Sequence, residues 1–263
     1  MISEHFDNIK ALIIDMDGVL WRDSQSIGNL SKIFEQIRMQ KLDFILATNN
    51  ATRTVEEYYD KLETFGVDLL DGHIINSAEA VGIFILEHFP KGTSVFVVGQ
   101  PSLKRTLADY GLKILEMEAR NAEIVVASLD YDLTYEKLKK ASLLIQDGAE
   151  FIGTNPDSSL PTPEGFIPGS GVVIGALEIA SGKKAKIIGK PESLLFEMAL
   201  KRLGSFPDQT LAIGDRLETD IAGAQAANIH TALVLSGAST QTQAEKFEPQ
   251  PEVIVKDLTE LLF

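Results

Sequence analysis

Short apolar runs and amphipathic segments alternate along the chain. Residues 11–14 and 42–47 are apolar runs of the length expected for buried strands. Between them, apolar side chains recur at helical spacing: Leu30, Ile33, Phe34 and Ile37. A second helix is predicted from another apolar stripe that a glycine can end: Val55, Tyr58, Leu62, Phe65 and Gly66. The pattern therefore starts as strand, helix, strand, helix.

Beyond Asn76 the alternation of strands and helices continues, but with different residue patterns. The later elements are predicted strands at residues 95–98, 124–127, 187–188, 211–213, 232–235 and 253–255, and helices that start near Pro101, Thr134, Pro191 and Glu218. A Gly- and Pro-rich stretch at residues 153–171 interrupts the series. Strands that alternate with helices predict the α/β class, with a mainly parallel, Rossmann-like sheet covered by helices.

The length of 263 residues allows one large domain or two ordinary ones, at roughly 150 residues per domain. The change of residue patterns beyond Asn76 predicts a smaller α/β domain inserted into a larger one. We therefore expect a first core part at residues 1–76, an inserted domain at 77–184 and a second core part at 185–263.

The amino-acid composition excludes several classes of function. Hydrophobic residues make up 44% of the chain, and no apolar run approaches the ~18 residues of a membrane span, so no membrane partner is expected. The N-terminal residues lack the features of a signal peptide, which predicts a cytoplasmic protein. The absence of cysteine excludes disulfides, thiolate catalysis and cysteine-ligated metals. The histidines show no paired metal-ligand spacing: His5, His73, His88 and His230.

The net charge of −14 argues against a nucleic-acid partner, because binding to a phosphate backbone needs clustered lysine and arginine. An anionic small substrate would need a local positive field against this background. A cation, a lysine and backbone amides could supply that field.

Four polar clusters each follow a predicted strand, at residues 15–18, 48–50, 189–191 and 214–220. Ligands of open parallel sheets bind outside the carboxyl ends of the strands, so these loops are predicted to converge on one crevice. Taken singly, each signal is weak. A second D-x-D pair, Asp130 and Asp132, is interpreted as a cap and turn, and Lys190 alone could be a surface lysine.

Together the clusters fit phosphoryl transfer, which needs an in-line nucleophile and neutralisation of negative charge. Asp15 can attack phosphorus, and Asp17, two residues on, points to the same side of an extended strand end and can protonate the leaving oxygen. Mg²⁺ prefers hard oxygen ligands, which Asp15 and Asp215 offer. The other roles are phosphate binding by Thr48 and the backbone amides after it, a point charge from Lys190, and orientation of Lys190 or a metal-bound water by Asp220.

This set, in this order, resembles the four motifs of the haloacid-dehalogenase superfamily of phosphatases: Asp15 with Asp17, then Thr48, then Lys190, then Asp215 with Asp220. The resemblance extends to the NagD-type or 4-nitrophenylphosphatase-like branch through DMDGVLWR, ATNNATR, LDYDLTYEKL, GTNPD, PTPEGFIPGSG, IGKP and IGDRLETDI, which span nearly the whole chain. The combined signal is strong because the motifs are many and ordered.

The resemblance implies a Mg²⁺-dependent phosphatase with an α/β cap between the second and third motifs. It implies metal ligands from the carboxylates of Asp15 and Asp215, the backbone carbonyl of Asp17 and, directly or through water, Asp220. It further implies an aspartyl-phosphate intermediate, small phosphorylated substrates such as sugar, glycerol or nucleoside phosphates, p-nitrophenyl phosphate in vitro, and a homodimer through the cap.

Several residue roles stay open at this point. Asn155 and Asp157 either select substrates from the cap or only form a turn. Asn49 and Asn50 are expected to bind phosphate, although Asn50 could merely shape its loop. Residues 23–28 replace the Gly-Asp and Pro-Gly residues that are common at this place in the branch, so the resemblance does not extend to the flap beside the nucleophile. Trp21 is interpreted as packing under that flap, and His230 as the start of a strand.

Alternatives of other classes fit less well. A receiver-type signalling domain is much shorter, and its acidic pair precedes a separate phospho-acceptor. A haloalkanoate dehalogenase needs neither Asp17 nor a metal. A non-catalytic phosphometabolite-binding protein on the same fold would be expected to lack one of the acids, and none is missing. A lone Gly169-Ser170-Gly171 does not make a dinucleotide loop, because Ile174 stands where a third glycine is needed.

Overall fold

In the computed structural model, which describes residues 2–162 and 164–263, the first apolar run forms β1 (Ala11–Ile14), and all four of its side chains are buried. A strand buried on both faces needs cover on both faces, as in a parallel sheet. β1 accordingly runs parallel to β13 (Thr210–Gly214) on one side and to β4 (Asp43–Thr48) on the other. β1 is thus an interior strand of its sheet.

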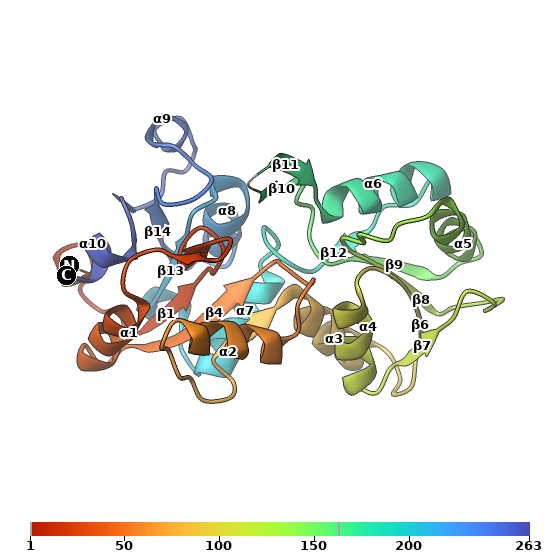
Figure 1. Ribbon diagram of the computed structural model, residues 1–263, viewed down its shortest axis with the longest axis horizontal. Helices are drawn as coiled ribbons and strands as arrows, with labels where there is room; N and C mark the ends of the chain where they lie inside the picture. Colours follow the sequence, from red (N-terminus) through yellow and green to blue (C-terminus); the bar gives the residue numbers. More distant parts are fainter. Residues whose placement is uncertain (1, 163) are drawn as a thin grey trace. The chain divides into compact units, whose positions relative to one another are not determined.

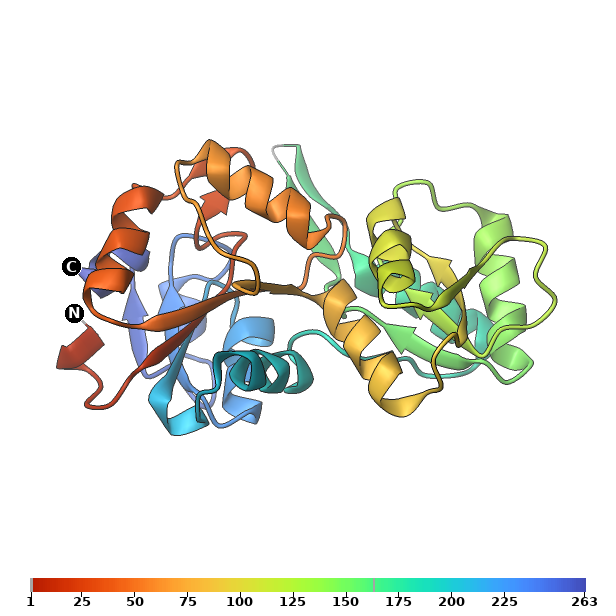
Figure 2. The same ribbon diagram turned by 90° about the horizontal axis from the view of Figure 1, so that it is seen from below.

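The chain divides into two compact units. Unit 1 comprises residues 1–48, 55–75 and 190–263, and unit 2 comprises residues 49–54 and 76–189. The sheet of unit 1 has the order β15, β14, β13, β1, β4, β5, with β5 at Ile74–Asn76, β14 at His230–Val234 and β15 at Val253–Val255. The amino and carboxyl termini lie beside each other in unit 1 (Figures 1 and 2).

Helices cover both faces of this sheet (Figures 1 and 2). One face carries α1 (Leu30–Met39), α2 (Val55–Thr64) and α10 (Leu258–Leu262), whose apolar residues share a core with β1, β4 and β13. The other face carries α7 (Leu194–Leu203) and α8 (Ala222–Ala226). The predicted stripe of α1 is buried, and its N-cap Asn29 accepts a hydrogen bond from the amide of Lys32.

The remaining elements of unit 1 are short: the 3-10 helices η1 (Ile2–Glu4) and η2 (Pro207–Gln209), the π-helical turn η3 (Leu217–Ile221), α9 (Gln241–Ala244), and a hairpin of β2 (Trp21–Arg22) and β3 (Gln25–Ser26). Its tight turn places Asp23 at φ 52°, a left-handed conformation that Asp tolerates better than most residues. Residues 23–26 of the unusual segment thus form the turn and the second strand of a hairpin.

Unit 2 contains a second parallel sheet, in the order β12, β9, β8, β6, β7. Its strands are β6 (Ser94–Val98), β7 (Lys113–Leu115), β8 (Ile124–Ala127), β9 (Glu150–Gly153) and β12 (Lys186–Ile187). The helices are α3 (Ser77–His88), α4 (Pro101–Asp109), α5 (Tyr135–Gln146) and α6 (Ser170–Ser181), and a separate antiparallel pair is formed by β10 (Ser159–Thr162) and β11 (Gly165–Pro168). Residue 163, in the predicted PTPEGFIPGSG motif, lies outside the described residues.

The α/β class and the parallel sheets are confirmed. Two expectations on elements need correction. The helix expected from Pro191 begins at Leu194, and the strand expected at residues 187–188 is β12, which pairs with β9 in the sheet of unit 2. The division at residues 76/77 and 184/185 stays a prediction of the cap boundaries.

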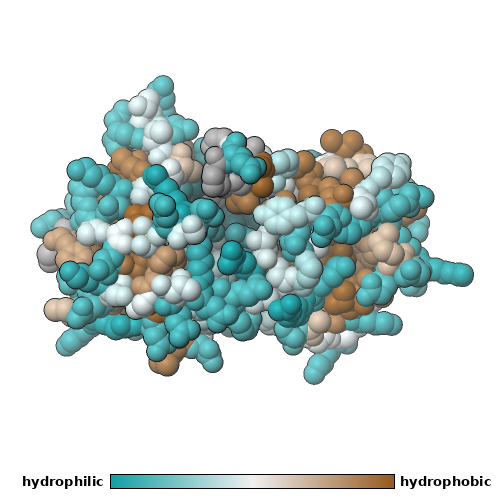
Figure 3. Space-filling model, in the orientation of Figure 1, coloured by the Kyte–Doolittle hydropathy of each residue, from teal (hydrophilic) through white to brown (hydrophobic). Residues whose placement is uncertain are grey.

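The molecular face in Figure 3 is largely hydrophilic, as the high net charge leads one to expect, with apolar groups gathered over α6. Among the described residues, no helix is both long enough and apolar enough to span a bilayer.

Candidate active site

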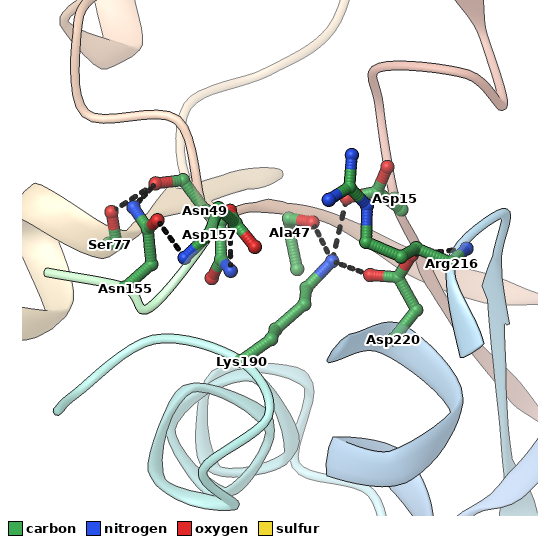
Figure 4. Close-up of polar contacts among 9 residues, drawn as sticks. All are labelled: Asp15, Ala47, Asn49, Ser77, Asn155, Asp157, Lys190, Arg216 and Asp220. Carbon is green, nitrogen blue, oxygen red and sulfur yellow. Dashed lines mark hydrogen bonds and ion pairs between the residues drawn. The ribbon is translucent and has the colours of Figure 1, made fainter. Parts of the chain in front are cut away.

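Lys190 occupies the centre of a buried polar cluster in unit 1 (Figure 4). Its ammonium Nζ donates to Oδ1 of Asp15 at 2.7 Å, to Oδ1 of Asp220 at 2.8 Å and to the backbone carbonyl of Ala47 at 2.7 Å. Three donors thus meet three acceptors, as a buried ammonium requires. Only 2% of the side chain is exposed, which excludes the surface-lysine interpretation.

The partners of Lys190 come from three strand ends, as the topology requires. Asp15 follows β1, Ala47 lies at the end of β4, and Asp220 lies in η3 just after β13. Since β1 sits between β13 and β4, their carboxyl ends lie at the same edge of the sheet. The convergence expected from the four polar clusters is therefore present for these residues.

Asp215 lies beside this cluster, directly after β13. Its Oδ2 accepts a hydrogen bond of 2.6 Å from the amide of Ala238. Two glycines leave room for its carboxylate, since a Cβ on either Gly18 or Gly237 would collide with it. Gly18 also has φ +88°, which side chains rarely adopt. The absence of side chains at Gly18 and Gly237 thus provides the space that the Asp215 carboxylate occupies.

The carboxylates of Asp15, Asp215 and Asp220 each offer an oxygen within 4.8 Å of the others, and all three residues are buried. Burial, followed by the negative charge of Asp220, raises the pKa of Asp15 well above its usual range. The same two causes raise the pKa of Asp215 to about 7, against the opposing hydrogen bond from Ala238. Burial alone would lower the pKa of Lys190, but the charges of Asp15 and Asp220 raise it instead.

The donor set fits a magnesium ion. Three carboxylates and one ammonium leave two uncompensated negative charges when all are ionised. Carboxylate oxygens are the ligands that Mg²⁺ uses, and a divalent cation would balance this excess. Burial, followed by the negative charge of Asp220, raises the pKa of both Asp15 and Asp215, so the ionised cluster is costly without a cation. The side chain of Asp17 is not a member of this carboxylate cluster.

Asp17 is instead hydrogen-bonded to the indole of Trp21, whose Nε1 lies 2.8 Å from Oδ1 of the carboxylate. Trp21 itself is fully buried at the start of β2. The sequence-based interpretation of Trp21 as packing thus described only its ring. Its polar contact with Asp17 was missed, because no local residue pattern predicts the turn that returns the indole to the carboxylate.

Thr48 ends β4 and is buried in unit 1, whereas Asn49 and Asn50 belong to unit 2. The side chain of Asn50 accepts from the amide and the hydroxyl of Thr52, so it shapes its own loop. Asn49 accepts at its carbonyl from Asn155 Nδ2 at 2.8 Å, and its Nδ2 donates to Asp157 at 3.2 Å (Figure 4).

Asn155 also accepts from the amide of Asp157, which is the local turn expected of these residues. Asn155 and Asp157 of unit 2 therefore form a turn and also hold the segment that directly follows Thr48.

Sequence reasoning missed the loop after β14, residues 236–239. Ser236 Oγ donates to the carbonyl of Gly18 at 2.7 Å, and its carbonyl accepts from Arg22 Nε at 2.6 Å. Ser239 completes the loop, since its amide donates to the carbonyl of Asp215 at 3.0 Å. This loop also follows a predicted strand, so the rule of strand carboxyl ends could have identified it.

Comparisons with known proteins find chains that are similar over nearly the full length. A family model described as haloacid dehalogenase-like hydrolase matches residues 12–113, and one described as HAD-hydrolase-like matches residues 187–261. The acid sugar phosphatase of Staphylococcus saprophyticus is 33% identical over 255 residues, which cover 97% of each chain. The acid sugar phosphatase of Staphylococcus epidermidis is 33% identical over 249 residues, 95% of each chain.

Solved structures give the same result over nearly the full length. The 4-nitrophenylphosphatase of Thermotoga maritima has a TM-score of 0.90 and 32% identity, covering 97% of this chain and 96% of that one. NagD from Escherichia coli K-12 has a TM-score of 0.87 and 29% identity, covering 96% and 98%. The p-nitrophenyl phosphatase of Archaeoglobus fulgidus has a TM-score of 0.90 and 28% identity, covering 97% and 98%.

Proposed function

Since this chain belongs to the haloacid dehalogenase-like hydrolases and is a phosphatase, we propose that it hydrolyses small phosphorylated metabolites through an aspartyl phosphate on Asp15. The observation that carries the proposal is the buried ammonium of Lys190 held between Asp15 and Asp220, with Asp215 alongside. A dianionic phosphate can bind beside this negatively charged carboxylate cluster only when positive charge lies next to it.

In the first half-reaction, a carboxylate oxygen of Asp15 attacks phosphorus, and the bond between phosphorus and the leaving oxygen breaks. We assign the attack to Oδ2, because Lys190 holds Oδ1. Asp17 gives its proton to the leaving oxygen, which departs as an alcohol. Thr48 and the amides of residues 49 and 50 bind phosphate oxygens, and Lys190 adds its charge.

In the second half-reaction, Asp17 takes a proton from a water molecule, whose oxygen attacks the phosphorus of the phospho-enzyme. The bond between phosphorus and Asp15 breaks, which releases inorganic phosphate and restores the carboxylate. Asp17 is then protonated again, ready for the next substrate.

Asp15 and Asp215, with the backbone carbonyl of Asp17, would hold a Mg²⁺ ion, and Asp220 would bind it directly or through water. When bound, the ion supplies the charge that keeps Asp15 ionised and polarises the phosphate oxygens. The residues of the chain then position the nucleophile, the acid and the phosphate around it.

The test of the nucleophile is the site of phosphorylation. Rapid acid quench during turnover of p-nitrophenyl phosphate, followed by intact-protein mass measurement and peptide mapping, should place one phosphate on Asp15. Asp15→Asn should keep the fold and give no adduct. An adduct on any other residue would overturn the proposal.

The role of Asp17 is tested by the choice of leaving group. A sugar alkoxide leaves poorly without a proton, whereas p-nitrophenolate leaves unaided. Asp17→Asn keeps the backbone carbonyl and should reduce the single-turnover burst rate by ~10²–10⁴-fold with an alkyl phosphate, and far less with p-nitrophenyl phosphate. Equal losses for both substrates would remove Asp17 from the acid role.

For the substrate class we propose sugar phosphates first, because curated relatives that match nearly the full chain are named acid sugar phosphatases. A panel of sugar, glycerol and nucleoside monophosphates, compared by kcat/KM, tests this. A preference for nucleoside monophosphates would refute the sugar class.

We also propose that unit 2 is the family's cap and that Asn155 and Asp157 act there in substrate selection. A cytoplasmic location, a homodimer through the cap and the lack of nucleic-acid or membrane partners stay predictions.

A further inference from the structure

Trp21 is the single tryptophan of the chain, and its indole is buried against the proposed general acid. A buried indole N–H needs an acceptor, and here the acceptor is a carboxylate oxygen, Oδ1 of Asp17. The backbone adds a second link, because the amide of Gly18 donates to the carbonyl of Trp21 at 2.7 Å. Residues 17–21 therefore form a closed turn in which the side chain of Trp21 returns to that of Asp17.

The indole ring is fixed by α2 and the residue that follows it. Tyr58 and Phe65 stack on the ring, with centroids 6.5 and 6.0 Å away and interplanar angles of 14° and 24°. The ammonium of Lys61 lies 4.0 Å from the ring centroid and also donates to the carbonyl of Asp23 in the hairpin turn, at 2.9 Å. These contacts lock the rotamer of the indole and, through Nε1, that of the Asp17 carboxylate.

We propose that Trp21 is the positioning residue of the acid in this phosphatase, an inference that rests on the proposed role of Asp17. An indole N–H can only donate, so it keeps Oδ1 as an acceptor and assigns the transferred proton to Oδ2. Proton transfer requires the acid within hydrogen-bond reach of the leaving oxygen. The hydrogen bond thus sets which oxygen of Asp17 meets the leaving group.

Trp21→Phe keeps an aromatic ring and removes the donor. We expect the single-turnover burst rate with a sugar phosphate to fall about 10²-fold, the cost of a misplaced reacting group, with little change for p-nitrophenyl phosphate or in KM. Phe65→Leu is the matched control, because it loosens the packing around the same ring and keeps the N–H. It should lower the melting temperature and leave the ratio of the two burst rates unchanged.

The single tryptophan allows a sharper version. Replacement of tryptophan by benzothienylalanine in an auxotrophic host changes only position 21 and exchanges the N–H for sulfur in a ring of nearly the same size. This protein should fold as the wild type does and still show the altered ratio of burst rates. A wild-type ratio in the folded protein would overturn the proposal.

A spectroscopic readout separates this inference from the proposed function. The ¹⁵N–¹H spectrum should contain one indole signal, which Asp17→Ala should shift and Asp23→Asn, in the adjacent turn, should not. An indole signal indifferent to Asp17→Ala would refute the hydrogen bond whatever the activity. Absence of phosphate on Asp15 in the wild type would instead overturn the proposed function, and the positioning role of Trp21 with it, while the indole signal still reports the contact.

Discussion

Replacing Lys190 by methionine isolates the electrostatic role of this residue. Lys190→Met keeps an unbranched apolar side chain of similar length and removes the ammonium that binds Asp15, Asp220 and the carbonyl of Ala47. The two carboxylates would then lie in the protein interior without their cation. Breaking a buried ion pair in this way costs about 3–5 kcal/mol, because the remaining charge stays desolvated.

That cost corresponds to a fall in melting temperature of roughly 6–20 °C, at about 2–4 °C per kcal/mol for a protein of this size. Differential scanning calorimetry in EDTA measures it without the compensating cation. Burial raises the pKa of both Asp15 and Asp215, so protons can neutralise the cluster in mild acid. The loss should therefore be smaller at pH 5 than at pH 8.

Lys184→Met is the matched control. Lys184 pairs with Glu178 at 2.6 Å, a separation similar to those of Lys190, but 87% of its side chain is exposed. Exposed pairs contribute about 0.2–1 kcal/mol, so the melting temperature should fall by no more than about 4 °C. Equal losses in the two variants would refute the argument that burial, and not contact distance, sets the energy of the pair.

Three further predictions concern the carboxylates. Chelation of the metal ion should abolish turnover and lower the melting temperature. A ligand that binds only the native state adds about 2.7 kcal/mol to the free energy of unfolding when its concentration is a hundred times its Kd. Full activity in excess EDTA would contradict this. In EDTA, the raised pKa of Asp215, about 7, makes the folded state bind more protons than the unfolded one. The contribution of Asp215 to stability should therefore be present at pH 4 and decline as pH rises to 7, by at most about 1.4 kcal/mol per pH unit. Calorimetry of Asp215→Asn should show a flatter decline than that of the wild type. Gly237→Ala should weaken Mg²⁺ binding, measured by calorimetric titration, because the added Cβ would collide with Asp215. Gly175→Ala should leave the binding unchanged, because a Cβ there meets no atom within 4 Å.

The sequence by itself determined the class of fold and the position of the main polar side chains along it. Strand and helix periodicity are local properties, so the runs that became β1, β8 and β15 could be located from a few neighbouring residues. The rule that ligands bind at strand carboxyl ends then selected Asp15 and Asp215, which follow β1 and β13. It also selected Lys190, although the strand before it, β12, belongs to the sheet of unit 2. The order of the four motifs supplied the family, because it depends on sequence alone.

Only the tertiary structure decided which atoms meet. Asp15 and Lys190 are 175 residues apart, and no local pattern specifies that one ammonium bridges Asp15 and Asp220. The glycines around Asp215 likewise became necessary only once the chain had brought residues 18 and 237 against one carboxylate. Trp21 was predicted as packing because an indole is mostly apolar surface. Its N–H bond to Asp17 depends on a ring orientation that α2, more than thirty residues later, imposes through side-chain packing.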